Sequence, residues 1–508
     1  MFESFSALMG GFQSILTPPL IFSSFLGCLI GIIVGVIPAL GATAGIAILL
    51  PSIYGKDPLT SLVMLAGIFF GSTFGGTITA VLINVPGAPC NICTVLDGYP
   101  IAKKGRPGAA IGMGSISSVV GGTIGAVLLT LAAVPLARWG LRLSAPEYFA
   151  VYFFAFMCLL NTMGEQFYKG LMALFVGFLV AFIGHDSLTG VTRFTFDNIN
   201  FYDGVNFVPA LIGLFGLGEI FCQIIDADSG KRTEDLSKTA KLTFRNMFPR
   251  LSELARCPLV WLRSSVIGFF TGVLPGAGGS TASFFAYEFE KGIAKNKDEW
   301  GTGVMEGVAA AEAANSSCFA GTYVPLFALG IPGSSTSAML LGALIILGCT
   351  PGPAFFTENP ALAWGTIASM YMANVILIVV CSLMCPLFLW VLKSTGKVLV
   401  TGVMTLCFVG VYCLNSEIID LWVMLVFGVI GYFCKIRKIP INPMVLALIL
   451  GSNTEVALRR GLVIAKGSWY AFCARPITAV FLIAAVAMFI MGLFSFIKAN
   501  KKRKGEIQ

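Results

Sequence analysis

The segment Ala310–Thr322 is the most polar stretch inside an apolar part of this sequence; it reads AAEAANSSCFAGT. It places a carboxylate (Glu312), an amide (Asn315) and a hydroxyl (Ser316) where lipid would make each of them costly unless it had a partner. Such groups can bind a polar substrate or a cation. We therefore take Asn315 and Ser316 as candidate substrate ligands and Glu312 as a candidate ion-coupling residue. The alternative is a structural role in hydrogen bonds between helices.

A second isolated carboxylate, Glu219, lies at the end of the apolar stretch LFGLGEI and is another candidate for ion coupling. A structural role with a buried partner is an equal alternative. Other sequence features argue against catalysis and against a metal site. His185 is the only histidine and Cys90–Cys93 is a single CxxC, so neither forms a metal-ligand set. We expect no catalytic residues, no metal site and no cofactor other than Na⁺ or H⁺ as the coupling ion.

These polar groups lie near glycine-proline interruptions that occur twice in the chain. The stretch GIIVGVIPALGA at 31–42 returns as GFFTGVLPGAGG at 268–279, with three glycines and a proline at one constant offset. NVPG at 84–87 similarly corresponds to GIPG at 330–333. Each interruption ends an apolar run and precedes a shorter one. Paired breaks in matching halves of a membrane protein point to a substrate site formed by broken helices.

A helix that starts after such a break presents unpaired N–H groups and a partial positive charge, so it can hold a carboxylate without a basic side chain. Nearby hydroxyls add neutral donors, and unwound carbonyls can bind Na⁺. The alternative is that glycine and proline only allow kinks and close packing. The candidate substrate-binding residues at and around the breaks are Pro38, Gly41, Thr43, Thr73, Asn84, Pro86, Gly87, Pro275, Gly278, Ser280, Pro332, Gly333, Ser334 and Ser335.

Composition indicates which fold positions these residues. Of the 508 residues, 56% are hydrophobic and 11% charged, and the mean hydropathy is +0.87. A soluble protein has about 25% charged residues. The apolar runs do not alternate as barrel strands would. We predict an all-α, polytopic membrane protein with broken helices or re-entrant hairpins. The net charge of +8 lies largely in loops and the tail, as expected next to a membrane, and gives no reason to expect nucleic acid binding.

The predicted organisation has four parts: a first membrane repeat half (1–225), a cytoplasmic linker (226–257), a second half (258–497) and a basic cytoplasmic tail (498–508). The runs at 43–53, 280–289, 336–347 and 441–451 are too short to span a bilayer. The first three follow breaks and are predicted to be half-helices. Matching loops of the two halves carry opposite charge bias, which predicts inverted repeats.

Several motifs of the sequence resemble those of a known family. The motifs that carry the resemblance are VIPALG at 36–41, VLPGAG at 273–278, INVPG at 83–87, DGYP at 97–100, EAANS at 312–316, GIPGS at 330–334 and PGPA at 351–354. They resemble the large membrane subunit of the tripartite tricarboxylate transporter family, the TctA type, and the similarity extends over nearly the whole chain.

The resemblance implies a multi-pass protein of the bacterial inner membrane that takes up di- or tricarboxylates. It also implies a periplasmic solute-binding protein and a small four-helix membrane subunit as partners, and uptake driven by an ion gradient. We expect the outer loop 185–205 to dock the binding protein, with Asp186 and Arg193 as test positions. The alternatives are a passive anion channel and a membrane-embedded enzyme acting on lipid-like substrates; we expect no enzyme.

Overall fold

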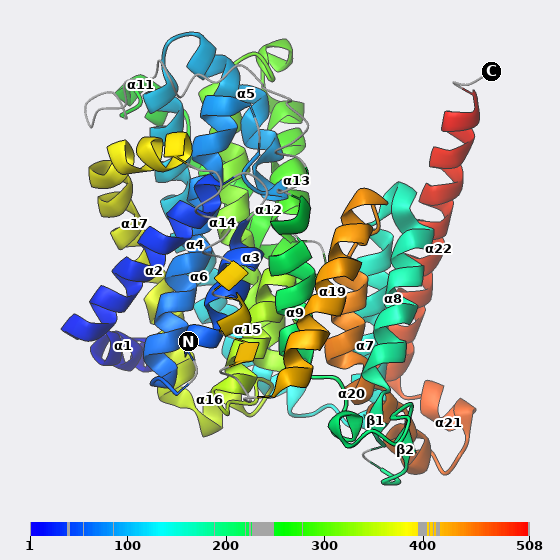
Figure 1. The fold of residues 1–508 in the computed structure, drawn as a ribbon. Helices are drawn as coiled ribbons and strands as arrows, with labels where there is room; N and C mark the ends of the chain where they lie inside the picture. The colour runs from blue at the N-terminus through cyan, green and yellow to red at the C-terminus, as the bar shows by residue number, and fades with distance from the viewer. Residues whose placement is uncertain are drawn as a thin grey trace. The chain divides into compact units, whose positions relative to one another are not determined.

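The computed structural model describes residues 2–37, 41–53, 55–84, 86–186, 188–218, 220–222, 225, 248–276, 278–394, 404–405, 407–409, 411–412 and 417–505. These residues are helical almost throughout (Figure 1). The one sheet among them is a two-stranded antiparallel hairpin, in which β1 (Gly184–His185) pairs with β2 (Thr192–Arg193). The prediction of an all-α membrane protein is confirmed.

Six helices among the described residues are long and apolar enough to cross a membrane. They lie at Pro18–Val36, Pro58–Leu82, Pro107–Gly140, Pro360–Cys381, Ile418–Ile436 and Pro476–Phe494. The helix α14 (Met305–Leu329) has 25 residues and is also long enough, but it contains the polar stretch around Glu312 and is buried along nearly its whole length. Length and burial therefore make α14 a central helix despite its polarity.

The chain forms two compact units, each assembled from separated stretches. Unit 1 comprises Met1–Ala137, Gln223–Val273 and Gly278–Gly410, and unit 2 comprises Arg138–Cys222, Leu274–Ala277 and Val411–Gln508. The units are interleaved along the chain and so differ from the predicted halves, which describe a sequence repeat; those halves and their inversion stay predictions.

Unit 1 is built around two pairs of closely packed helices. Its elements are α1 (Phe2–Ile15), α2 (Pro18–Val36), α3 (Gly41–Leu49), η1 (Leu50–Ile53), α4 (Pro58–Ile83), η2 (Pro89–Asn91), α5 (Ile92–Lys103), most of α6 (Pro107–Gly140), α11 (Leu251–Leu254), α12 (Pro258–Val273), α13 (Gly278–Ile293), η8 (Lys297–Glu299), α14, α15 (Ser335–Ile346), α16 (Phe355–Glu358) and α17 (Pro360–Ser394). In one pair α2 packs on α4, and in the other α12 packs on α14. The Phe69 and Phe319 rings, 3.8 Å apart, join the two pairs.

Glycines bring the helices of each pair into backbone contact. A Cβ on Gly35 of α2 would lie 2.0 Å from the carbonyl oxygen of Ser72 on α4. In the second pair, a Cβ on Gly272 of α12 would lie 2.2 Å from the carbonyl oxygen of Cys318 on α14. Gly35 and Gly272 occupy the same position of the sequence repeat, so the two copies repeat one packing contact. No larger side chain fits at either position.

Short helices follow all four breaks, as predicted. α3 and α13 follow the first break of each copy, and the turn η2 with α5, and α15, follow the second. α3 and α13 begin at Gly41 and Gly278, with φ of +59° and +62°. This left-handed region is one that glycine adopts without the penalty of a Cβ. The repeated glycines therefore allow the chain to turn sharply from one helix into the next.

Unit 2 is a smaller helical assembly that carries the hairpin. Its elements are α7 (Ala145–Asn161), η3 (Gly164–Gln166), α8 (Phe167–Ala181), β1, β2, η4 (Ile199–Phe201), α9 (Phe207–Leu211), the π-helical turn η5 (Ile212–Leu217), α19 (Ile418–Ile436), α20 (Asn442–Ile464), α21 (Trp469–Cys473) and α22 (Pro476–Gly505). α7 packs against α20 and α22, and α8 packs against α20.

The helix that contains the apolar run 441–451 is longer than the run itself. The run belongs to α20, which has 23 residues but is not among the six described helices that are apolar enough to cross a membrane. The helix continues through polar residues that include Glu455 and Arg459. These two are spaced i, i+4 and form an ion pair of 2.6 Å. Such a pair supports a helix beyond the end of its apolar run.

Candidate functional site

The short helices of unit 1 meet in two places, and each place joins the first break of one copy to the second break of the other. In one, α3 packs on α15, and the Thr43 and Thr336 hydroxyl oxygens lie 2.8 Å apart. In the other, α13 packs on η2, where a Cβ on Gly279 would lie 3.2 Å from the Cβ of Cys90. The predicted break residues Gly41, Gly278 and Thr43 therefore lie in regions where half-helices begin side by side.

Asn315 lies at the second of these places. Its Oδ1 would be 2.3 Å from a Cβ on Gly279, so the amide lies against the first turn of α13. Its side chain is fully buried, and neither its Oδ1 nor its Nδ2 has a hydrogen-bond partner. A buried amide without partners costs free energy, about 1–3 kcal/mol for each unsatisfied group. An unpaired amide beside a helix N-terminus is therefore ready to accept a ligand.

Glu312 lies one helical turn before Asn315 on α14 and is also fully buried. Its Oε1 accepts hydrogen bonds from Thr94 Oγ1 at 2.5 Å and from Asn91 Nδ2 at 3.2 Å, and its Oε2 accepts one from Ser118 Oγ at 3.3 Å. All of these partners are neutral. Asn91 and Thr94 belong to η2 and α5, the elements that follow a break. The Glu312 carboxyl group is therefore hydrogen-bonded directly to the elements that follow a break.

Asp97 is a third buried polar group, about one turn beyond Thr94 along α5. Its Oδ1 accepts backbone N–H bonds from Gly301 (3.0 Å), Gly303 (2.8 Å) and Val304 (2.8 Å). Its Oδ2 accepts the Tyr287 hydroxyl at 2.8 Å. The carboxylate thereby joins α5 to α13 and to the loop that leads into α14. This is the arrangement expected of a structural anchor at a helix N-terminus.

A cavity of about 620 Å³ adjoins the first turn of α14. Two bidentate ion pairs line it: Arg106 with Glu253 at 2.6 and 2.9 Å, and Arg263 with Glu290 at 2.8 and 2.7 Å. The hydrogen bonds from Arg106 lower the pKa of the Glu253 carboxyl. Glu312 lies about two turns further along α14. The cavity is thus a polar space close to the candidate site, at an end of unit 1 rich in basic residues.

The other predicted residues of unit 1 differ in what their side chains do. Gly87 and Gly333 are buried against the carbonyl oxygens of Gly35 and Gly272, which a Cβ would approach to 2.6 and 2.8 Å. Three predicted residues differ in exposure near the helix ends: Asn84 ends α4 with φ of +58° and is exposed, Pro86 is half-buried, and Ser280 is exposed in the first turn of α13. Pro332 and Ser316 are buried, and Ser335 begins α15. Two hydroxyls make local hydrogen bonds: Ser334 caps α15 by accepting from the Ser337 N–H at 3.2 Å, and Thr73 donates to the Phe69 carbonyl at 3.1 Å. Substrate binding by any of these stays a prediction.

A further predicted residue, Pro275, is not part of this cluster. Pro275 is buried in the segment Leu274–Ala277, which belongs to unit 2, where Gly276 packs against Leu159. Pro38 and Glu219 lie outside the described residues.

Comparison with known proteins agrees with this architecture. The family model described as "Tripartite tricarboxylate transporter TctA family" matches residues 21–446. The chain belongs to the TctA family. It is therefore a multi-pass membrane subunit of a tripartite tricarboxylate transporter, and its family is one of transporters. The match includes every break and the whole of α14.

Two relatives from Agrobacterium vitis are also similar to this chain. The "Uncharacterized 52.8 kDa protein in TAR-I ttuC' 3'region" is 35% identical over 503 residues, which cover 99% of each chain. The "Uncharacterized protein in TAR-II ttuC' 3'region" is 35% identical over 234 residues, covering 46% of this chain and 97% of the relative. No solved structure matches the chain.

Several residues of the candidate site escaped the sequence analysis. They are Asn91, Thr94, Asp97, Ser118 and Tyr287. Asn91 lies inside the CxxC at Cys90–Cys93, where attention went to the cysteines. Asp97 was noted only as part of the DGYP motif. A lone carboxylate within an apolar run was the available signal for Asp97, whereas nothing in the spacing of Ser118 or Tyr287 indicated their partners.

Proposed function

We propose that this chain is the large permease subunit of a binding-protein-dependent secondary transporter for di- or tricarboxylates, driven by a Na⁺ or H⁺ gradient. The observation that carries the proposal is Asn315, whose buried, unpartnered amide lies against the start of α13. A ligand that accepts hydrogen bonds from the Asn315 Nδ2 and from the N–H groups at the start of α13 would satisfy both sets of donors.

A carboxylate has the required chemistry. The segments 41–55, 86–102, 278–290, 305–329 and 330–350 contain no Lys or Arg. The negative charge of a substrate must therefore be balanced by helix N-termini, neutral donors and a co-bound cation. Hydrogen bonds in which one partner is charged contribute about 1.5–3 kcal/mol each, enough to reward a site built from neutral donors. Selectivity then comes from the spacing between donor groups, and the donors themselves suit several small organic acids.

Glu312 supplies the coupling step. A cation bound at Glu312, either H⁺ or Na⁺, neutralises a carboxylate that otherwise stands one turn from the substrate's own negative charge. At this distance two like charges in a medium of low polarity repel each other strongly. Substrate binding thus favours cation binding and the reverse, which is the reciprocity that coupled transport requires. Because Asn91 and Thr94 hold Glu312, the loss of its charge also releases η2 and α5 to move.

The surroundings of the protein follow from the same proposal. The basic end of unit 1 faces the cytoplasm of a bacterium, the protein lies in the inner membrane, and a periplasmic solute-binding protein and a small membrane subunit complete the transporter. The cavity at the start of α14 then lies on the route by which substrate leaves the site on the cytoplasmic side.

The test is uptake of labelled carboxylates into proteoliposomes that contain this chain and its small subunit. Uptake is measured with and without the solute-binding protein, and with external Na⁺ replaced by choline or with the pH gradient collapsed. We expect accumulation only with the binding protein and one of the two gradients. Downhill flux that is indifferent to both would contradict the proposal and indicate a passive anion channel.

A further inference from the structure

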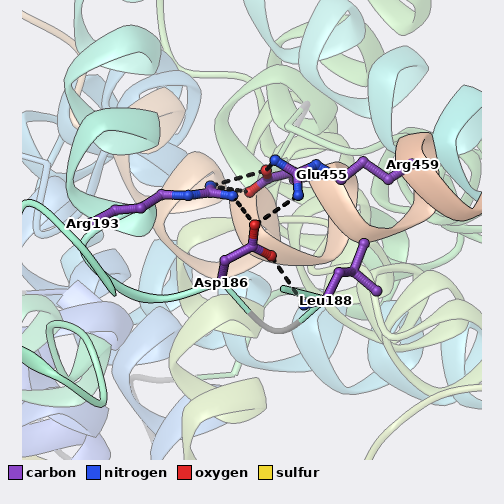
Figure 2. Close-up of polar contacts among 5 residues, drawn as sticks. All are labelled: Asp186, Leu188, Arg193, Glu455 and Arg459. Carbon is purple, nitrogen blue, oxygen red and sulfur yellow. Dashed lines mark hydrogen bonds and ion pairs between the residues drawn. The ribbon is translucent and has the colours of Figure 1, made fainter. Parts of the chain in front are cut away.

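The hairpin of unit 2, residues 184–204, is held rigidly against α20 by four charged side chains (Figure 2). Arg193 donates to both carboxylate oxygens of Glu455, at 2.9 and 3.0 Å, and also pairs with Asp186. Arg459 bonds Asp186 at 2.7 Å and Glu455 at 2.6 Å. The hydrogen bond from the Leu188 N–H contributes most to lowering the pKa of Asp186, and the contacts with Arg459 and Arg193 lower it further. Asp186 and Arg193 are therefore internal to the hairpin, and replacing them would disturb its structure before it disturbed any partner.

Several apolar side chains of the hairpin, outside this ion cluster, are exposed. Phe196 is 88% exposed and Ile199 75% exposed, with Val191 and Phe194 nearby and also exposed. We call these four residues the apolar tip. The chain at the tip has an uncommon conformation, because Phe194, Phe196 and Asp197 all have φ between +50° and +56°. Residues other than glycine rarely adopt this region, and clusters of them are characteristic of binding segments.

The tip faces the outer side of the membrane. In unit 2 the hairpin and α21 lie at one end, and α22 carries the chain to the opposite end, where the basic tail begins (Figure 1). Basic residues next to a membrane span face the cytoplasm. The hairpin is thus accessible to a protein in the periplasm.

Charge argues that the tip's partner is a protein and not the lipid surface. The exposed charges of the hairpin are Asp197 and Asp203, while Arg193 is engaged in the ion cluster. Segments that lie on membranes combine apolar side chains with basic residues. Exposed acidic residues in the same segment as exposed apolar ones match instead a protein surface with an apolar recess and basic residues beside it. A rigid, preformed tip also loses little conformational freedom when it docks.

We infer that the apolar tip, braced by the Asp186–Arg193–Glu455–Arg459 cluster, is the docking surface for the solute-binding protein. The inference rests on the proposed function and goes further by assigning the contact to Phe196 and Ile199 and by predicting an apolar recess with a basic rim on the partner.

The test compares the double variant Phe196→Ser, Ile199→Ser with Tyr470→Ser. Tyr470 is 84% exposed on α21, at the same end of unit 2, but lies outside the hairpin. Uptake is measured against the concentration of the solute-binding protein. We expect the double variant to raise the half-saturating concentration of binding protein at least tenfold, and Tyr470→Ser to stay within twofold of the wild type. Exchange of labelled substrate without binding protein serves as the check that the double variant is intact. An unchanged half-saturating concentration in the double variant would overturn the inference.

A second measurement separates this inference from the proposed function. A photo-crosslinking phenylalanine analogue is placed at position 196 in the full chain with its small subunit in nanodiscs, and purified solute-binding protein is added. A covalent product with the binding protein supports the docking surface even if uptake needs no gradient. A product with phospholipid alone, or with the small subunit alone, overturns it. Uptake by the wild type that ignores the binding protein contradicts the proposed function by itself.

Discussion

Asp97 and Glu312 are both fully buried carboxylates of unit 1, but they are held by different kinds of donors. Asp97 accepts three backbone N–H bonds and one hydroxyl bond, from groups fixed by the fold. Glu312 accepts only from side chains, which can turn away or exchange partners. The backbone donors of Asp97 are fixed in place by the fold, whereas the side-chain donors of Glu312 can rearrange around a neutral group. We therefore call Asp97 the anchor, because its donors are fixed, and Glu312 the switch, because its donors can rearrange.

The largest effect is expected from Asp97→Ala. This change removes the acceptor of three backbone N–H groups and of the buried Tyr287 hydroxyl, at a cost of about 3 kcal/mol. Thermal unfolding in nanodiscs should show a strongly lowered midpoint. Glu299→Ala, an exposed acidic residue near the same loop, is the control and should behave as the wild type. A midpoint for Asp97→Ala equal to that of the wild type would remove the distinction between the two carboxylates.

Glu312→Gln should change stability little and transport strongly, the reverse of what is expected for Asp97→Ala. The amide has nearly the same shape and can still accept from Thr94, so the free energy of unfolding should change by about 1 kcal/mol or less. If Glu312 binds the coupling cation as proposed, gradient-driven accumulation of substrate should fall about 100-fold, while substrate exchange continues. Glu306→Gln, on the same helix, is the matched control. Loss of stability as large as that of Asp97→Ala would show that Glu312 is also an anchor.

Asn315→Ala tests whether the residue one turn from Glu312 contributes to substrate binding. Asn315 makes no hydrogen bonds in the described structure, so its loss should not lower stability, but substrate affinity should fall about tenfold, equivalent to 1.4 kcal/mol. Asn374→Ala is the control, because Asn374 is also buried and unpartnered but lies on α17 against Gly122. Equilibrium binding of labelled carboxylate measures both. Equal losses of affinity in the two variants would rule out a specific role for Asn315.

Tyr287→Phe tests the role of Asp97 by removing only one of its hydrogen bonds. Asp97 loses one of four donors and keeps its backbone bonds, so the free energy of unfolding should fall by about 1 kcal/mol. Transport should remain coupled to the gradient. If this variant uncoupled transport, Asp97 and Tyr287 would belong to the switch.

Asp186 provides a third carboxylate, paired with cations outside the membrane. Its pKa in the folded protein lies below the usual value of an aspartate, about 3.9. It therefore contributes stability that is fully present above this value and is lost as the pH falls toward the folded pKa. The stability difference between wild type and Asp186→Asn should be constant from pH 7 to about pH 5 and shrink below pH 4. A difference that grew at low pH would contradict the assignment of the ion cluster.

The sequence was informative where geometry is local. Glycine and proline at fixed offsets predicted where α3, α13 and α15 begin, because left-handed turns and helix starts depend on a few neighbouring residues. The polarity of Glu312 and Asn315 within an apolar run marked them as important before any fold was known.

Contacts between distant residues could not be predicted in this way. That Thr43 meets Thr336, that Asn91 and Thr94 hold Glu312, and that Asp97 accepts from the loop before α14 all depend on how two copies of a repeat pack together. Asp186 and Arg193 were chosen as docking residues because they are charged and lie in an outer loop. Their partners on α20, more than 250 residues away, show why the charges point inward.

The most direct test of the central claim is to count cations that move with each carboxylate. Wild-type and Glu312→Gln proteins are reconstituted with the small subunit and binding protein, and uptake of labelled carboxylate is recorded together with radioactive Na⁺ and internal pH. We predict that Na⁺ or H⁺ enters with substrate in the wild type and that this entry is absent in Glu312→Gln, which only exchanges substrate. Co-entry of the same cation in the Glu312→Gln variant would contradict the account.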